Sequence, residues 1–177
     1  MNHFPCDLSR AAEVDRAAAA VAAFLAGGPT GRILLINNSG IGAFGRFPEP
    51  DLERELAMVD LNVRAVVQLT GRLLPLLRAR GGVIMNIAST VAFQPTAYAA
   101  TYGATKAFVL HWTIALNEEL RGSNVRALAV CPGTTRTEFF HQAGAAGAEQ
   151  APFAMTSEAV VKIALRALGY GRAQVVT

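Results

Sequence analysis

The sequence has little cysteine, few lysines and no long hydrophobic run, and each shortage excludes a class of protein. Two cysteines, Cys6 and Cys131, are too few for a disulfide scaffold. The longest apolar run, residues 17–26, is about half of the roughly 20 residues that cross a bilayer. The first residues show neither the basic region nor the apolar region of a secretory signal. We therefore expect a cytoplasmic protein with reduced thiols and no membrane association.

Charge also narrows the choice of partners. The 177 residues include 16 Lys and Arg against 13 Asp and Glu, for a net charge of +3. The basic residues are scattered and form no stripe with interleaved aromatics, so we expect no nucleic-acid partner. Only Lys106 and Lys162 are lysines. In an arginine-rich chain a lysine is worth noting, because burial and neighbours can tune its pKa.

The hydrophobic pattern predicts an α/β fold. Short, fully apolar runs are typical of strands in a parallel sheet that is covered on both faces. These runs are residues 32–36, 82–87 and 125–130. Amphipathic helical segments alternate with them, at residues 9–26, 51–79, 97–121 and 157–168. The alternation predicts one doubly wound, Rossmann-like domain over residues 1–177.

Some details of these segments carry further expectations. Asp51 and Glu53 suit a helix N-terminus, and Pro75 is expected to kink or end the second long helix. The alanine-rich stretch 143–151 is expected to be a mobile loop near the ligand site. No strand and glycine turn precede the first helix, except for a short candidate strand at His3–Cys6. Residues 174–177 resemble a strand that is just starting, so we expect a partial domain, without its first βαβ unit and shortened at its C-terminus.

The run Gly40-Ile41-Gly42-Ala43-Phe44-Gly45 fits the G-x-G-x-x-G pattern of a phosphate-binding turn. Such a turn must lead directly into a helix. Here Pro48 and Pro50 intervene and keep the residues before them out of the helical conformation. We therefore interpret residues 37–40, Asn-Asn-Ser-Gly, as a tight turn after a strand instead.

A phenol and an ammonium group lie one helical turn apart in the third helix. Tyr102 and Lys106 are spaced i and i+4, so their side chains share a face. A cation favours the phenolate and is expected to lower the pKa of Tyr102, which would make it a general acid/base. The same spacing also fits a half-buried tyrosine beside a lysine whose chain runs along the surface. Tyr98, one turn earlier, is a competing candidate.

Other polar residues are expected at the same edge of the sheet. Ser89 follows the end of a central strand, where its hydroxyl could hold a carbonyl oxygen beside Tyr102. Asn62 interrupts an apolar helix face; a buried asparagine needs partners, and a water held there could pass protons to Lys106. Residues 131–137 follow the third strand as a turn that is rich in hydroxyls. Cys131 itself is interpreted as a small buried residue rather than a nucleophile.

Together these motifs resemble those of the short-chain dehydrogenases/reductases. The turn at 37–40 is similar to the family's N-N-A-G, Tyr102 and Lys106 to its Y-x-x-x-K, and Pro132-Gly133 with Thr137 to its P-G turn. Asn62 and Ser89 match the helix asparagine and the serine thirteen residues before the tyrosine. The resemblance implies hydride transfer between a nicotinamide cofactor, NAD or NADP, and a small carbonyl or alcohol substrate.

The resemblance also implies roles for individual residues. The catalytic residues would be Asn62 in a proton relay, Ser89 orienting the substrate oxygen, Tyr102 as acid/base and Lys106, which would also bind the ribose. Residues that would line the cofactor are Asp7, Asn37, Gly40, Val63, Tyr102, Lys106, Pro132, Gly133, Thr135 and Thr137. Asp7 would meet the adenine. A homodimer or homotetramer through helices 51–79 and 97–121 is implied. No metal is expected, since His3, His111 and His141 lack ligand-like spacing.

The sequence departs from the family in one important respect. It has no T-G-x-x-x-G-x-G turn, and the residue that would separate NAD from NADP has no counterpart. A non-catalytic binding or regulatory module, or an inactive fragment, is therefore the alternative function. In the family's sheet order, the strand ending at Ile36 would be an open edge. We expect residues 3–6 or a second chain to cover this edge, or the chain to be a shortened product of a longer one.

Overall fold

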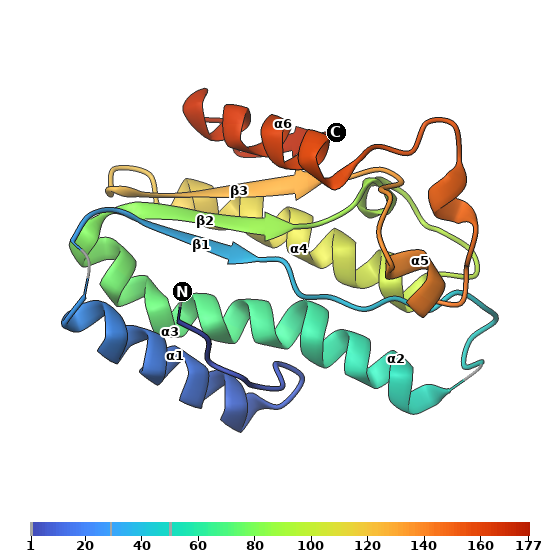
Figure 1. Ribbon diagram of the computed structural model, residues 1–177, viewed down its shortest axis with the longest axis horizontal. Helices are drawn as coiled ribbons and strands as arrows, with labels where there is room; N and C mark the ends of the chain where they lie inside the picture. The colour runs from blue at the N-terminus through green and yellow to red at the C-terminus, as the bar shows by residue number, and fades with distance from the viewer. Residues whose placement is uncertain (1, 29, 50) are drawn as a thin grey trace.

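A parallel sheet of four strands forms the middle layer of the molecule (Figure 1). The computed structural model describes residues 2–28, 30–49 and 51–177. The strands lie side by side in chain order and are β1 (Ile33–Asn37), β2 (Gly82–Ile87), β3 (Val125–Cys131) and β4 (Gln174–Val176). All three pairings are parallel, which confirms the predicted sheet type.

Helices cover both faces of this sheet. They are α1 (Ala11–Ala26), α2 (Leu52–Val59), a π-helical turn (Asp60–Arg64), α3 (Ala65–Arg80), α4 (Ala100–Glu119), α5 (Phe139–Gln142) and α6 (Ser157–Gly169). Two 3₁₀ turns complete the elements, Thr90–Phe93 and Ala148–Gln150. In Figure 1, α1 and α3 lie below the sheet and α6 lies above it, and α4, drawn behind the strands, shares the core on the α3 face. The predicted doubly wound α/β architecture is therefore confirmed.

Alternation along β2 explains the two-sided core. Successive strand residues point to opposite faces. Ile84 packs with Leu77 and Leu116 on the side of α3 and α4. Its neighbour Met85 packs with Ala164 on the side of α6. The strand therefore needs apolar residues at consecutive positions, which is the pattern that predicted it.

The long helical segment between β1 and β2 is interrupted by the π-helical turn and not by proline. Asp51 caps its start, where the carboxylate accepts a hydrogen bond of 3.0 Å from the backbone N–H of Glu53. The expectation that Pro75 could end the helix is wrong, because α3 continues to Arg80. Leu73 and Leu77, on either side of the proline, are buried in the core. This packing outweighs the hydrogen bond that proline cannot donate.

The predicted strand at His3–Cys6 is wrong. These residues form no strand, and Phe4 instead packs against Phe24 of α1 with ring centres 6.3 Å apart. Among the described residues, the outer edge of β1 has no strand partner. Leu34 and Ile36 remain 43% and 49% exposed. The open edge expected from the sequence is therefore present, and no described residue pairs with it as a strand.

Among residues 2–28, 30–49 and 51–177, no helix combines the length and the hydropathy that crossing a bilayer requires.

Candidate active site

The candidate site lies where the strands end, at the carboxyl edge of the sheet. Asn37 is the last residue of β1, Ser89 follows β2 by two residues, and Pro132 follows β3 directly. The first turn of α4 brings Tyr102 to the same edge. Ligands of open α/β sheets bind in this position.

Tyr102 and Ser89 come together as the sequence predicted. Tyr102 is only 7% exposed, and the Ser89 side chain lies near enough to its phenol to affect the pKa of Tyr102. Burial raises the pKa of Tyr102 to about 12, although the Ser89 contact lowers it. The expected lowering of this pKa by a lysine is therefore wrong in direction. The amine of Lys106 lies 5.8 Å from the ring centre, and loss of hydration outweighs its attraction for the phenolate.

Lys106 is buried beneath the site. Its amine donates a hydrogen bond of 2.8 Å to the carbonyl oxygen of Ile87, the last residue of β2. Burial lowers the pKa of Lys106 to about 8, partly offset by the Cys131 thiol. Burial in turn raises the pKa of Cys131 to about 11. That thiol stays protonated at neutral pH, as the interpretation of Cys131 as a small buried residue requires.

Asn62 is held by its neighbours through both of its amide hydrogens. Its Nδ2 donates to the Ile41 carbonyl at 2.9 Å and to Thr105 Oγ1 at 3.1 Å. Its Oδ1 accepts from the Ile41 N–H at 3.0 Å. Thr105 Oγ1 in turn donates to the Tyr102 carbonyl at 2.8 Å. The side chain of Asn62 thus positions the turn after β1 against α4, and the water-mediated relay to Lys106 stays a prediction.

Thr105 belongs to this constellation and was not predicted. It stands between Tyr102 and Lys106 in the sequence and is almost fully buried. A hydroxyl on the inner face of a helix needs a partner, and that requirement is the signal that could have identified it.

Gly40 lies where a side chain would crowd the site. A Cβ atom there would be 3.1 Å from Asn62 Oδ1 and 3.5 Å from Lys106 Nζ. The glycine therefore lets the turn after β1 approach both polar groups closely. The glycine run itself leads into no helix before Leu52, which confirms that it is not a phosphate-binding turn of the helical kind.

Asn37 has internal partners. Its Nδ2 donates to Asn86 Oδ1 at 2.7 Å and to Thr70 Oγ1 at 3.0 Å. Asn86 Nδ2 continues the chain to Thr113 Oγ1 at 2.8 Å. These buried hydrogen bonds join β1 and β2 to α3 and α4 below them, so the side chain of Asn37 fixes the floor of the site.

The segment after β3 forms the opposite wall. The Pro132 carbonyl accepts a bond of 3.4 Å from Ser89 Oγ, and Thr135 Oγ1 donates to the Gly133 carbonyl at 3.1 Å. Thr137 Oγ1 accepts from the Phe139 N–H at 3.3 Å, at the start of α5. The P-G turn is thus tied directly to the serine beside Tyr102.

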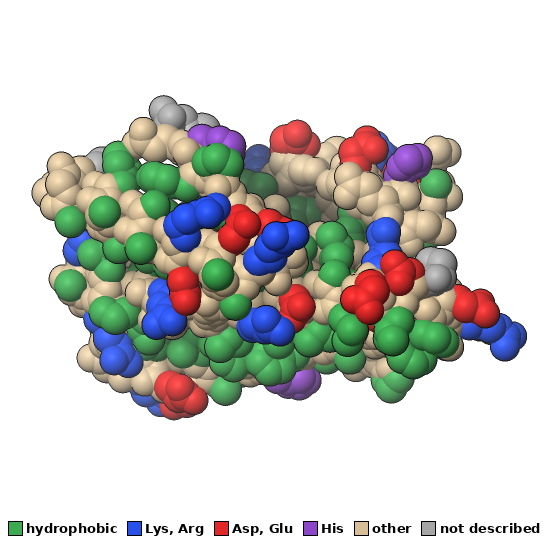
Figure 2. Space-filling view, turned by 90° about the horizontal axis from the view of Figure 1, so that it is seen from below, with side chains coloured by type: hydrophobic (Ala, Val, Ile, Leu, Met, Phe, Trp, Pro, Cys, Tyr) green, Lys and Arg blue, Asp and Glu red, His purple; other side chains and the backbone are tan. Residues whose placement is uncertain are grey.

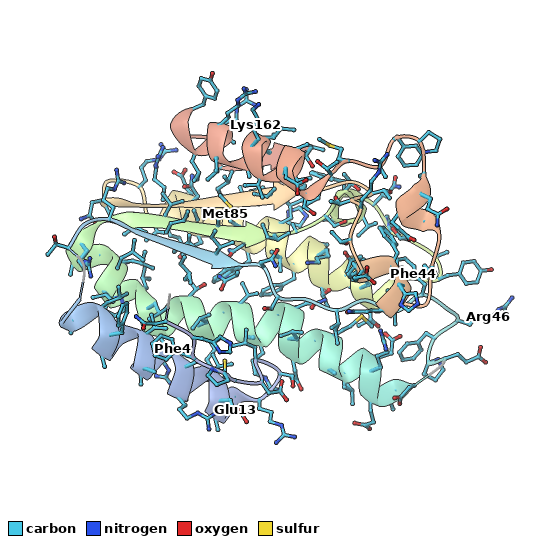
Figure 3. All side chains as sticks on the ribbon, in the orientation of Figure 1. Phe4, Glu13, Phe44, Arg46, Met85 and Lys162 are labelled. Atoms are coloured by element: carbon cyan, nitrogen blue, oxygen red, sulfur yellow. The ribbon has the colours of Figure 1, made fainter. Side chains whose placement is uncertain are left out.

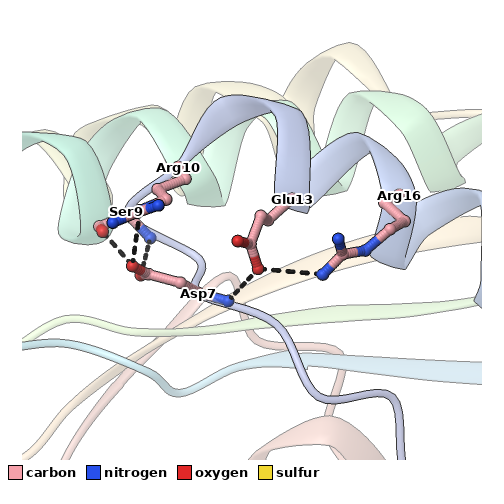
Figure 4. Close-up of polar contacts among 5 residues, drawn as sticks. All are labelled: Asp7, Ser9, Arg10, Glu13 and Arg16. Carbon is pink, nitrogen blue, oxygen red and sulfur yellow. Dashed lines mark hydrogen bonds and ion pairs between the residues drawn. The ribbon is translucent and has the colours of Figure 1, made fainter.

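Asp7, Val63 and the competing candidate Tyr98 differ in their surroundings. Asp7 precedes α1, where its carboxylate accepts bonds from Ser9 and pairs with Arg10; the bonds from Ser9 lower the pKa of Asp7 (Figure 4). Val63 is half-buried in the π-helical turn. Tyr98 is 60% exposed, and the guanidinium of Arg46 stands 6.0 Å above its ring. In Figure 3, Arg46 points outward from the molecule. Of the two tyrosines, only Tyr102 lies in the site.

Residues 2–28, 30–49 and 51–177 contain no cluster of three or more His, Cys, Asp and Glu side chains that could hold an ion.

A family model described as short chain dehydrogenase matches residues 1–147. Serine 3-dehydrogenase of Rhizobium radiobacter is 38% identical over 108 residues, which are 60% of this chain and 43% of the relative. The ketoacyl reductase HetN of Nostoc is 40% identical over 101 residues, 56% of this chain and 35% of the relative. The chain therefore spans less than half the length of these curated relatives.

Solved structures resemble nearly the whole chain. The short-chain dehydrogenase from Sphingobium yanoikuyae in complex with NADPH is 35% identical with a TM-score of 0.82, and the match covers 97% of this chain and 65% of that one. The bulky-bulky ketone specific alcohol dehydrogenase from Comamonas testosteroni is 28% identical with a TM-score of 0.79, covering 98% and 64%. Both of these proteins extend beyond the part that this chain matches.

Proposed function

Since this chain belongs to the short-chain dehydrogenase family, we propose that it acts in the NAD- or NADP-dependent interconversion of a small carbonyl compound and its alcohol. The observation that carries this proposal is the buried Tyr102 phenol, which lies beside Ser89 and one helical turn from the buried amine of Lys106. A phenol and a hydroxyl side by side can both approach one carbonyl oxygen, which is the geometry that proton transfer to that oxygen needs.

Tyr102 is the proton donor in this proposal. Its pKa of about 12 keeps the phenol protonated at neutral pH, so it has a proton to give when a carbonyl is reduced. Ser89 would orient the carbonyl oxygen toward the phenol. The Lys106 amine, with a pKa of about 8, is mostly protonated at pH 7 and favours the phenolate once it forms.

The residues fit the reactive end of a nicotinamide cofactor. When bound, the cofactor supplies or accepts the hydride. Gly40 leaves room beside Asn62 and Lys106 that a Cβ atom would fill, and Lys106 has an amine that can donate to a ribose hydroxyl. Asn37, Val63, Pro132, Gly133, Thr135 and Thr137 complete the proposed cofactor-lining set, with Asp7 toward the adenine. The Sphingobium protein, solved with NADPH, supports this assignment by its likeness.

The experiment compares Tyr102→Phe with the unchanged chain. Cofactor binding is measured by calorimetry with NAD and NADP, and turnover by the absorbance of reduced nicotinamide with a panel of ketones and aldehydes. Removing the phenolic proton should lower kcat/KM by about 100-fold or more and leave cofactor affinity within about twofold. Tyr98→Phe, one turn earlier and exposed, is the matched control and should retain full activity. Equal turnover by both variants would show that Tyr102 is not the proton donor.

One feature favours a different function. The sequence has no T-G-x-x-x-G-x-G turn, so a binding or regulatory module that keeps the pocket without catalysis is the second candidate. A folded chain that binds neither NAD nor NADP in the same calorimetry would favour it.

We also propose a homodimer in a reducing, cytoplasmic compartment. Exposed apolar side chains follow one stripe from α2 to α3: Leu52, Leu56, Val59 and Val67. Phe108 of α4 is exposed as well, and its ring stacks on Trp112. Figure 2 shows the helical face, with charged side chains of both signs across its middle and hydrophobic ones gathered along its lower margin. The free thiols Cys6 and Cys131 suit a reducing environment.

A further inference from the structure

Three phenylalanine rings form an aromatic cluster with Tyr102. Phe44 and Phe139 contact its ring, with centres 6.0 and 5.3 Å away. Phe140 contacts both phenylalanines, at 6.3 Å from Phe44 and 5.3 Å from Phe139. The four rings therefore form a closed circuit in which each touches two others. We call Phe44, Phe139 and Phe140 the aromatic wall.

The aromatic wall joins two distant parts of the chain. Phe44 comes from the segment between β1 and α2, and the other two rings come from α5 (Figure 3). The Phe44 N–H donates to the Ala143 carbonyl at 3.1 Å. Arg54 of α2 donates to the Gly42 carbonyl at 2.9 Å and also to the Gln142 carbonyl. The two segments are thus fastened together on both sides of the rings.

Gly42 allows the rings to meet. A Cβ atom at this position would lie 2.6 Å from Cζ and 3.1 Å from Cε2 of Phe139. No side chain fits there unless the Phe139 ring moves. The second glycine of the G-x-G-x-x-G pattern therefore serves the packing of α5 against the site.

The surroundings of the aromatic wall are apolar. The side chains packed with Tyr102 and the wall are Ile41, Ala43, Met58, Val91 and Ala99. The polar groups nearby have partners inside the protein: the Lys106 amine donates to Ile87, and the Asn62 amide donates to Ile41 and Thr105. The nearest charged groups are the Lys106 amine, 5.8 Å from the centre of the Tyr102 ring, and the Arg54 guanidinium, and both already donate to backbone carbonyls.

This arrangement of rings determines which substituents of a carbonyl substrate would bind favourably. A carbonyl oxygen at the Tyr102 phenol places its substituents beside Phe139, because that ring touches the ring of Tyr102. An aromatic substituent gains edge or stacking contacts there. A carboxylate would lose hydration against these rings, while the nearest cations, Lys106 and Arg54, are already engaged by backbone carbonyls, so its burial is costly.

We propose that the aromatic wall selects carbonyl substrates with an uncharged aromatic or alicyclic substituent. The selection rests on the proposed function, which makes the Tyr102 phenol the group that meets the carbonyl oxygen. Phe44, Phe139 and Phe140 are its specificity-determining residues.

The test measures binding without cofactor. Saturation-transfer NMR titrations give the affinity of the chain for acetophenone and for phenylglyoxylate, in which a carboxylate replaces the methyl group. Acetophenone should bind at least about 10-fold more tightly. Phe139→Ala should weaken acetophenone binding by about 5-fold or more, since an aromatic pair contributes roughly 0.5–1.5 kcal/mol beyond the area it buries. Phe139→Leu keeps an apolar side chain and the fold. Its affinity for acetophenone should lie between that of the unchanged chain and that of Phe139→Ala.

The matched control is Phe153→Ala, whose ring is 76% exposed beyond α5. It should bind acetophenone as the unchanged chain does. Equal affinity for the two probes, or unchanged acetophenone binding in both Phe139 variants, would overturn the proposal. Tighter binding of phenylglyoxylate that is lost in Arg54→Met would overturn it too, by assigning Arg54 to a carboxylate. If acetophenone binding depends on Phe139 but no ketone is turned over, only the proposed function is contradicted. If the chain turns over charged oxo acids, only the proposed selectivity of the aromatic wall is contradicted.

Discussion

Lys106 is the residue whose surroundings change its chemistry most. Its amine is almost fully buried and has the Ile87 carbonyl as its hydrogen-bond partner. Burial without a carboxylate favours the neutral amine, so its pKa falls to about 8 from an ordinary value of 10.5.

This shift predicts how stability depends on pH. Between pH 8 and 10.5 the unfolded chain binds more protons at Lys106 than the folded chain, so the free energy of unfolding rises with pH. Cys131 and Tyr102 act in the opposite sense, because burial raises the pKa of each, to about 11 and about 12. Their effects grow above about pH 9, so the contribution of the lysine is clearest between pH 8 and 9.

Urea unfolding at pH 8 and 9 should reveal the contribution of Lys106 to the pH dependence of the free energy of unfolding. Replacing Lys106 by methionine should remove about 1 kcal/mol from the change in unfolding free energy over this interval. Lys162→Met, at an exposed position of α6, is the control and should leave the change as it is. Identical pH profiles for the unchanged chain and the Lys106 variant would show that the amine is not desolvated.

For individual residues, the sequence predicted that Tyr102, Lys106 and Ser89 lie close together, but not the direction in which the pKa of Tyr102 shifts. The spacing of Tyr102 and Lys106 and the position of Ser89 after a strand were enough to bring the three together. The direction of the tyrosine pKa shift could not be predicted, because it depends on how much water the folded chain removes. That quantity is set by Phe44 and Phe139, which come from segments that no local pattern connects with Tyr102.

Among the elements, α5 depends most on a single side chain elsewhere. It spans only Phe139–Gln142, too short to be stable alone. Arg54 holds it by donating to the Gln142 carbonyl, and holds the turn after β1 through the Gly42 carbonyl. The guanidinium thus acts as a positioning group for the aromatic wall.

Arg54→Met should loosen α5. Hydrogen bonds from a charged donor contribute about 1.5–3 kcal/mol each, so local opening should increase by about 10-fold or more. Limited trypsin digestion would detect this as faster cleavage after Arg136, the exposed basic residue just before α5.

The control for this prediction is Arg64→Met. Arg64 pairs with Asp60 at the surface, where an ion pair contributes little. Cleavage after Arg136 should be unchanged in this variant. An equal increase in both variants would mean that Arg54 stabilises the chain in general and not α5 in particular.

Some helices and strands could be predicted from a short sequence pattern, whereas other features of the helices depend on packing against distant residues. The apolar runs gave β1, β2 and β3, and Asp51 marked the start of α2, because these signals act over a few residues. The π-helical turn at Asp60–Arg64 and the continuation of α3 through Pro75 were not predicted. Both depend on contacts of the helix with the turn after β1 and with the core, which lie far away in the sequence.

The whole chain presents two apolar surfaces of different kinds. One is the outer edge of β1, where Leu34 and Ile36 are exposed and Leu34 lines a groove of about 330 Å³ between β1, α1 and α3. The other is the stripe on α2 and α3, together with Phe108. The edge offers unpaired backbone groups, and the stripe offers side chains alone.

Light scattering after size exclusion should separate the two surfaces. Phe108→Glu should convert the proposed dimer to monomer, because a charge replaces an exposed apolar side chain on the proposed interface. Ile36→Lys should leave the dimer mass unchanged and reduce larger aggregates several-fold, since lysine on an edge strand discourages pairing with other chains. Loss of the dimer in the Ile36 variant instead would show that the subunits pair through β1.

The π-helical turn limits how this protein can change in length. A π-helical turn contains one residue more than the α-helix needs, so deleting a residue from 60–64 would restore a regular helix and rotate everything before it by about 100°. Asn62 would then no longer face the Ile41 backbone, and α2 would turn Arg54 away from α5. Single-residue gaps are therefore expected to be tolerated in the surface connections of this chain and not at this point of an otherwise continuous helix.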